Sequence, residues 1–261
     1  MSSTTLPHTS ELPAVRGPAR AVPFTRLAAV ELRKLADTRT AVVLLSLLLL
    51  GAVAAMVVNA SFFTEDVQEV ATSAALTLGL FLPVVGIVSV TSEWSKRTAL
   101  TTFALEPRRW RVLVAKAVAG TLVAVATSAL MLAVAYPTTA VAAAVRGVPA
   151  DFMLDPVTLA GWTAVNVLFT LCGVALGSML LGGAAAIVVY FVASVAWGFI
   201  SLTGDPGSTL ASWLDLNVTT VPLADGVMSS EAVGPLLASI GLWVAGPFLL
   251  GLLRVHRMEL R

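Results

Sequence analysis

Residues 157–202 read VTLAGWTAVNVLFTLCGVALGSMLLGGAAAIVVYFVASVAWGFISL, a run of 46 residues without a charged side chain. A single helix of that length would extend about 69 Å, more than twice the roughly 30 Å hydrocarbon core of a bilayer. The glycine pair at 182 and 183 instead favours a tight turn between two shorter spans, at 157–181 and 183–202. The stretch therefore predicts a helical hairpin that crosses a membrane twice.

Four further apolar runs are long enough to cross a bilayer, and they bring the expected number of spans to six: 41–60, 71–91, 112–136 and 233–253. Each backbone polar group inside a bilayer must be satisfied within its own segment, so helices are the form expected for all six. The composition agrees, with 57% hydrophobic and 12% charged residues. The sequence predicts an all-α membrane protein with six transmembrane helices.

The charges are distributed asymmetrically about these spans. With six spans, 15 of the 16 lysines and arginines fall on one side, and only Arg146 falls on the other. The opposite loops carry 9 of the 15 acidic residues. By the positive-inside rule, both termini are expected in the cytoplasm of a multi-pass protein of the cell membrane. A five-span chain would place Arg254, Arg257 and Arg261 outside, so the charges also favour six.

The segments outside the spans include two tails, one helix and two long loops. We expect a flexible cytoplasmic tail at 1–23 and a cytoplasmic tail at 254–261. Residues 24–40 are expected to form an amphipathic elbow helix whose basic face suits the headgroup layer, although it can also serve only to anchor the first span. Its apolar arc contains Phe24, Leu27, Ala28, Leu32 and Leu35, and Glu31 breaks that arc.

Two loops are longer than simple connections require. The cytoplasmic loop at 92–111 contains five lysines and arginines, and we interpret it as a docking surface for a soluble partner. The alternative is a plain basic loop with interfacial tryptophans. The outer loop at 203–232 has no lysine or arginine, and whether it re-enters the membrane is left open.

Several function classes lack the residues they need. There is no G-x-x-x-x-G-K-[ST] run for nucleotide binding, and Cys172 is the only cysteine. His8 and His256 lie outside the spans, and the span centres contain no acidic residue for ion coupling. The net charge of +1 gives no indication of nucleic-acid binding. We expect no catalytic, cofactor or metal site in this chain, and no enzymatic activity of its own.

The spans carry aromatic and small residues instead. One aromatic residue of the second span and four of the fifth are candidates to line a hydrophobic path, with lipid contact as the alternative: Phe81, Tyr190, Phe191, Trp197 and Phe199. In the fourth span, Gly173 and Gly177 permit close helix approach, either within the chain or between two chains.

Two segments resemble a known family. Glu31-Leu-Arg-Lys34-Leu-Ala-Asp-Thr-Arg39-Thr is similar to the elbow-to-first-span junction of the membrane permease subunits of type-2 ABC exporters. The order Glu93, Thr98 and Pro107-Arg108-Arg109-x-Arg111-x4-Lys116 resembles the loop that leads into their third span. The resemblance covers about residues 24–253. Many members have one arginine about three residues after the proline, whereas this chain has Arg109 and Arg111 on either side of Trp110.

The resemblance implies a function. The chain would form half of the membrane channel, paired with an identical or similar permease subunit, embedded in membrane lipid and driven by a cytoplasmic ATP-binding-cassette subunit that holds ATP and Mg. Its cargo would be a hydrophobic or amphiphilic drug, lipid or peptide, and the five aromatic residues would contact it. The residues that would receive force from the ATPase are Glu31, Lys34, Glu93, Lys96, Arg97, Thr98, Pro107, Arg108, Arg109 and Arg111. The competing hypothesis is a six-span passive facilitator or a membrane subunit that binds a small molecule.

Overall fold

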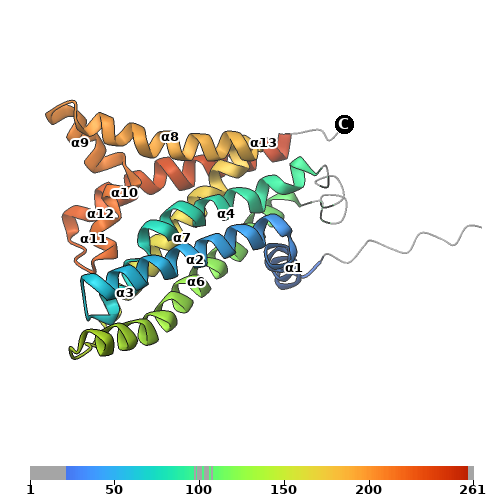
Figure 1. Cartoon of the computed structure of the whole chain (residues 1–261). Coiled ribbons are helices and arrows are strands. Elements are labelled where there is room, and N and C mark those ends of the chain that lie inside the picture. Colours follow the sequence, from blue (N-terminus) through green and yellow to red (C-terminus); the bar gives the residue numbers. More distant parts are fainter. Residues whose placement is uncertain (1–21, 97, 99–101, 103–105, 107, 258–261) are drawn as a thin grey trace, which may run out of the picture.

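The computed structural model describes residues 22–257, apart from 97, 99–101, 103–105 and 107 (Figure 1). Most of the expected tails, together with Arg97 and Pro107, therefore lie outside the described residues. The described part contains six helical segments that are long and apolar enough to cross a membrane, as a multi-pass membrane protein requires. They are α2 (Arg39–Phe62), α4 (Ala75–Ser95) with the short α3 (Val67–Thr72) before it, α6 (Arg109–Arg146), α7 (Pro156–Leu180), α8 (Gly183–Ser201), and the last span, which consists of α12 (Ser230–Ile240), the π-helical turn η1 (Gly241–Ala245) and α13 (Gly246–Arg257).

The fourth and fifth spans are separate helices, as the glycine pair predicts. The carboxylate of Asp155 accepts hydrogen bonds from the first amides of α7 and so caps its start. The chain turns at Leu181, which has a left-handed φ of 56°, and Gly182 then caps α8. The left-handed residue is thus a leucine, one position before the glycines.

The third span is longer than expected. The apolar pattern predicts an end at Tyr136, but α6 continues through Pro137 to Arg146, for a total of 38 residues. Contacts with other elements hold the added turns: Tyr136 stacks on Phe152 with ring centroids 5.8 Å apart. Arg146 also donates hydrogen bonds to the carbonyl of Ala60 in the last turn of α2 and to that of Thr64 just after α2. Tertiary packing therefore outweighs the helix-breaking preference of the proline.

Helices α4 and α7 pack closely at the centre of the bundle. A Cβ placed on Gly173 of α7 would lie only 2.0 Å from the backbone oxygen of Pro83 in α4, so only glycine fits at this crossing. Gly177 of α7 packs against Ile87, which also belongs to α4. The two glycines therefore serve helix packing within the chain.

Pro83 also explains a hydrogen bond between α4 and α8. A proline has no amide proton, so the carbonyl four residues earlier, that of Gly79, loses its helical donor. The hydroxyl of Tyr190 donates to that carbonyl at 2.8 Å. The buried tyrosine thus satisfies the backbone group that the proline leaves free.

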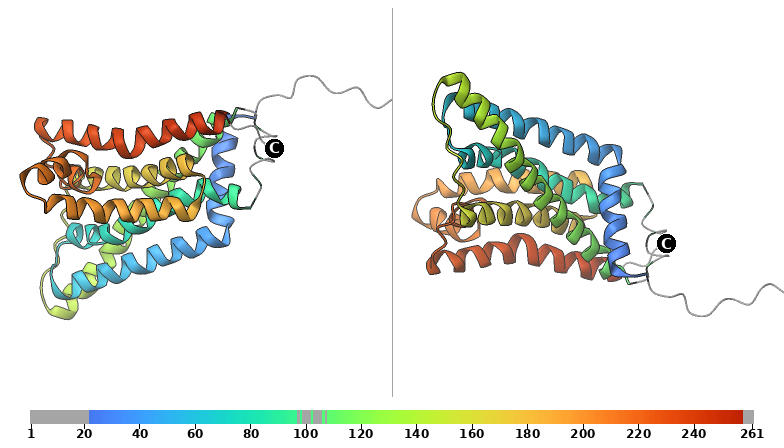
Figure 2. Two further views of the ribbon diagram at one scale, coloured as in Figure 1. Left: turned by 90° about the horizontal axis from the view of Figure 1, so that it is seen from above. Right: turned by 90° about the horizontal axis from the view of Figure 1, so that it is seen from below.

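The two ends of the bundle differ. The helix α1 (Phe24–Asp37) lies across one end, close to where α13 finishes, and we call this the α1 end (Figure 2). At the opposite end, three short helices connect α8 to α12: α9 (Asp205–Leu214), α10 (Leu216–Thr219) and α11 (Val221–Ala224). The indole of Trp243 in η1 donates to the carbonyl of Leu214 at 2.8 Å and so attaches the last span to α9.

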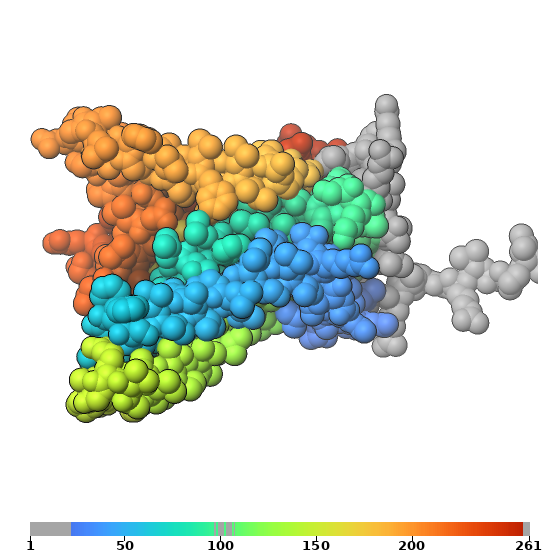
Figure 3. All heavy atoms as spheres, viewed as in Figure 1, coloured from blue at the N-terminus to red at the C-terminus, as the bar shows by residue number. Residues whose placement is uncertain are grey.

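The fifth span is the least covered. Figure 3 shows α8, in light orange, along one edge of the visible face. Large apolar residues recur along it at helical spacing and are 58–68% exposed: Val188, Val192, Val195 and Phe199. We call these four residues the α8 stripe. A membrane protein presents such a surface either to lipid or to another chain.

Candidate functional site

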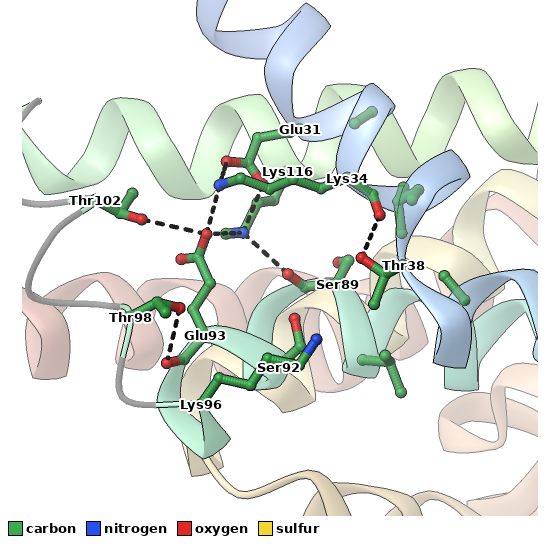
Figure 4. A pocket seen from close by; sticks show the side chains of 14 residues that line it. Glu31, Lys34, Thr38, Ser89, Ser92, Glu93, Lys96, Thr98, Thr102 and Lys116 are labelled. Carbon is green, nitrogen blue, oxygen red and sulfur yellow. Dashed lines mark hydrogen bonds and ion pairs between the residues drawn. The ribbon is translucent and has the colours of Figure 1, made fainter.

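Four charged side chains meet at the α1 end, and we call them the charge cluster: Glu31, Lys34, Glu93 and Lys116 (Figure 4). The Nζ of Lys34 lies 2.6 Å from one oxygen of Glu31 and 2.6 Å from Oε1 of Glu93. The Nζ of Lys116 lies 2.6 Å from the other oxygen of Glu31 and 3.3 Å from the same Glu93 oxygen. Two cations and two anions thus alternate, and they connect α1, α4 and α6.

Most of the cluster is buried. The side chains of Lys116, Glu31 and Glu93 are 3%, 4% and 9% exposed. Only Lys34, at 41%, is open to the outside. A buried charge is tolerated when it is paired and hydrogen-bonded, and removing one partner typically costs about 3–5 kcal/mol. Removal of one member would therefore leave an unpaired buried charge between the three helices.

The sequence of α1 places Glu31 on the buried face of the helix. Residues spaced by four share a face of a helix, and the buried residues of α1 are Leu27, Glu31 and Leu35. The glutamate that interrupts the apolar arc is thus part of the buried face. Leu32, which belongs to the expected arc, is 37% exposed instead. Pairing with Lys116 makes the burial of Glu31 possible.

The environment of Lys34 favours its charged form. Burial lowers the pKa of this ammonium, but hydrogen bonds and electrostatic attraction from Glu31 and Glu93 raise it by more. The pKa of Lys34 therefore lies above its ordinary value of 10.5. At neutral pH this residue keeps its charge.

Hydroxyl and carbonyl groups complete the cluster. The ammonium of Lys116 also donates to the carbonyl of Ser89 at 2.9 Å, so all three of its protons have acceptors. Thr102 donates weakly to Oε1 of Glu93 at 3.4 Å, and Thr98 donates to the Glu93 carbonyl through its amide at 2.9 Å. The start of the loop after α4 is thus attached to the cluster.

The arginines before and within α6 have separate partners. Arg111 is 11% exposed, pairs with Glu106 and donates to the carbonyl of Val22 just before α1. Arg109 donates to the carbonyl of Val255 at 2.6 Å and so joins α6 to α13. Arg108 is exposed at the start of α6. Of the two arginines that flank Trp110, Arg111 is therefore the one that links the loop to the α1 region.

The expected coupling residues divide into three groups in the structure. Glu31, Lys34 and Glu93 belong to the charge cluster, and Lys96 and Thr98 line the pocket beside it. Arg108, Arg109 and Arg111 lie at the start of α6, outside the cluster. Sequence reasoning missed the central position of Lys116, although this residue closes the second motif. The sequence does single out Lys116, because no other lysine occurs in any of the six apolar runs.

The five aromatic candidates do not form one continuous surface within the chain. Tyr190 is buried and lies edge-on to Phe191, with ring centroids 5.2 Å apart. Trp197 and Tyr190 line a small cavity of about 20 Å³ together with Asp215. Phe81 packs against the core of α2, α4 and α6, whereas Phe199 belongs to the exposed α8 stripe.

Comparisons with known proteins add no assignment. No protein-family model matches the chain, and no curated protein matches it. The function is therefore inferred from the contacts within the chain and from the resemblance of the two sequence segments.

Proposed function

We propose that this chain is the transmembrane subunit of an ATP-driven exporter of the type-2 ABC class, with its termini in the cytoplasm. In this proposal α1 is the elbow helix, residues 92–111 form the coupling loop, and ATP is hydrolysed on a separate chain. A second, identical or similar permease subunit completes the path, and the cargo is hydrophobic or amphiphilic.

The observation that carries the proposal is the charge cluster. It connects a helix lying across the bundle end to two spans, through Glu31 and Lys34 of α1, Glu93 of α4 and Lys116 of α6. A push applied to α1 or to the loop after α4 would therefore be transmitted to α4 and α6 together. An energy-coupled transporter whose ATPase lies outside the membrane needs such a connection.

The distribution of exposed groups supports the proposal. The α1 end presents Arg108, which leaves a cation available to a soluble partner. The α8 stripe supplies an apolar surface that a second subunit can cover. Phe199 lies on that stripe, so it would face the path only after two subunits pair.

Charge reversal at the loop tests the proposal. We would purify the chain with its ATPase from native membranes and compare Arg108→Glu/Arg109→Glu with wild type. The expected result is loss of the ATPase from the complex, with membrane insertion intact. Glu231→Lys serves as the control, because it alters an exposed charge at the opposite end. A passive facilitator would be indifferent to both changes, and that result would contradict the proposal.

A further inference from the structure

A pocket of about 350 Å³ opens beside the charge cluster, between α1, the last turns of α4 and the start of α6 (Figure 4). Its size is within the range of cavities that hold small molecules. It lies at the α1 end, where α4 ends and α6 begins.

The pocket has hydrogen-bond donors that the protein does not use. Lys116 has acceptors for all three of its protons, whereas Lys34 uses two of its three. Lys96 also lines the pocket, and Figure 4 shows it extending toward Ser92. Within the part of the chain that the structure describes, Lys96 forms no ion pair.

The charges of the lining do not cancel. Three lysines and two glutamates line the pocket, and both glutamates are already paired with Lys34 and Lys116. The remaining positive charge is that of Lys96. A ligand with one negative charge would therefore neutralise the pocket without disrupting the cluster.

Of the nine other lining residues, four are aliphatic and five carry hydroxyl groups: Thr38, Ser89, Ser92, Thr98 and Thr102. The aliphatic lining residues are Leu35, Ala41, Val88 and Ala119, from α1, α2, α4 and α6. A pocket that combines spare ammonium donors, hydroxyl groups and aliphatic side chains is suited to an amphiphile that has an anionic head. Basic pockets between spans on the cytoplasmic side are typical sites for anionic lipid headgroups.

We propose that this pocket binds an anionic phospholipid, with its phosphate group at Lys96 and Lys34 and its acyl region against the aliphatic lining. The proposal takes the α1 end as the cytoplasmic end, as in the proposed function, but it does not depend on transport or on an ATPase partner. It concerns a lipid bound at the side of the charge cluster, away from the aromatic residues of α8.

The test is lipid binding by the purified full chain in detergent. Native mass spectrometry would count bound phosphatidylglycerol and phosphatidylcholine over a titration of each lipid. We expect wild type to prefer phosphatidylglycerol, and Lys96→Gln to weaken its binding about tenfold, the effect expected for losing one charge-assisted hydrogen bond. Lys96→Arg should retain the preference. Arg257→Gln is the matched control, because it removes an exposed cation at the same end, on α13 and outside the pocket.

Two results would overturn the proposal. One is that Lys96→Gln and Arg257→Gln alter phosphatidylglycerol binding to the same extent, which would show a general surface attraction. The other is that inorganic phosphate alone displaces the lipid from wild type, because the site would then recognise a soluble phosphate rather than a lipid. Lys96 is exposed at the end of α4, and unchanged thermal unfolding would show that its variants fold.

Discussion

The ammonium of Lys116, about two turns inside α6, lies 2.6 Å from a carboxylate oxygen of Glu31, 85 residues earlier in the chain. Both side chains are almost completely buried. This pair joins α1 to the third span, and Glu93 and Lys34 extend the connection to α4.

Removing Lys116 should destabilise the protein strongly. Lys116→Met leaves two buried glutamates facing one lysine, and we expect a loss of about 3–5 kcal/mol of unfolding free energy, measured by chemical or thermal unfolding in detergent. Arg33→Gln is the control, since its pair with Asp37 is largely exposed and should contribute less than about 1 kcal/mol.

The double variant Glu31→Gln/Lys116→Met refines this prediction. It removes one charge of each sign, so it should lose less than the sum of the two single variants. Two results would show that the pair does not join the helices. One is that the losses of unfolding free energy of the two single variants add exactly in the double variant, and the other is that Lys116→Met is as stable as Arg33→Gln.

Alkaline pH should weaken the cluster through Lys34. The pKa of Lys34 is raised in the folded protein, so its contribution is complete below the unfolded value of about 10.5 and is lost as the pH rises through the higher folded value. The stability difference between wild type and Lys34→Gln should therefore shrink above about pH 10.5, as followed by unfolding at a series of pH values. A difference that stays constant through this range would argue against the pairing.

The crossing of α4 and α7 should not accept a methyl group on α7. Gly173→Ala places a carbon against the backbone oxygen of Pro83, and overpacking of this kind costs about 1–3 kcal/mol. Gly79→Ala, on the partner helix, meets nothing within 4 Å and should leave the melting temperature unchanged or slightly higher. Equal melting temperatures for the two variants would mean that the helices do not cross this closely.

The hydroxyl of Tyr190 should matter for stability. Tyr190→Phe leaves the Gly79 carbonyl without a donor, and an unsatisfied buried group costs about 1–3 kcal/mol. Tyr136→Phe is the matched control, because Tyr136 is 38% exposed and keeps its stacking on Phe152. If Tyr190→Phe melts like the Tyr136 variant, another group must satisfy the Gly79 carbonyl.

The six spans are predictable from the sequence because their signal is local: length and hydropathy alone distinguish them. The hairpin after α7 is also predictable, since no bilayer accommodates 46 residues in one helix. The end of α6 is not, because Pro137 and the following turns are held by Phe152 and by the end of α2, which are distant in the chain. Bounds that depend on tertiary contacts are not visible in a local pattern.

The charge cluster is predictable only in part, because some of its residues stand out locally whereas their pairing depends on the fold. Glu31 stands out as a charge on an apolar arc, and Lys116 as a lysine in an apolar run. That the two neutralise each other is a relationship between distant segments, and only the fold reveals it. The aromatic residues show the limit of local patterns, because spacing on α8 does not separate buried Tyr190 from exposed Phe199.

The most direct measurement is the nucleotide dependence of flux through the purified protein. The tagged chain would be isolated from its native membranes, its partners identified by mass spectrometry, and the complex reconstituted in vesicles with a fluorescent phospholipid and a lipophilic dye as probes. We predict that a separate P-loop ATPase copurifies in equal amount and that probe movement requires ATP and Mg. A chain that purifies alone and moves either probe without nucleotide would contradict the proposed function.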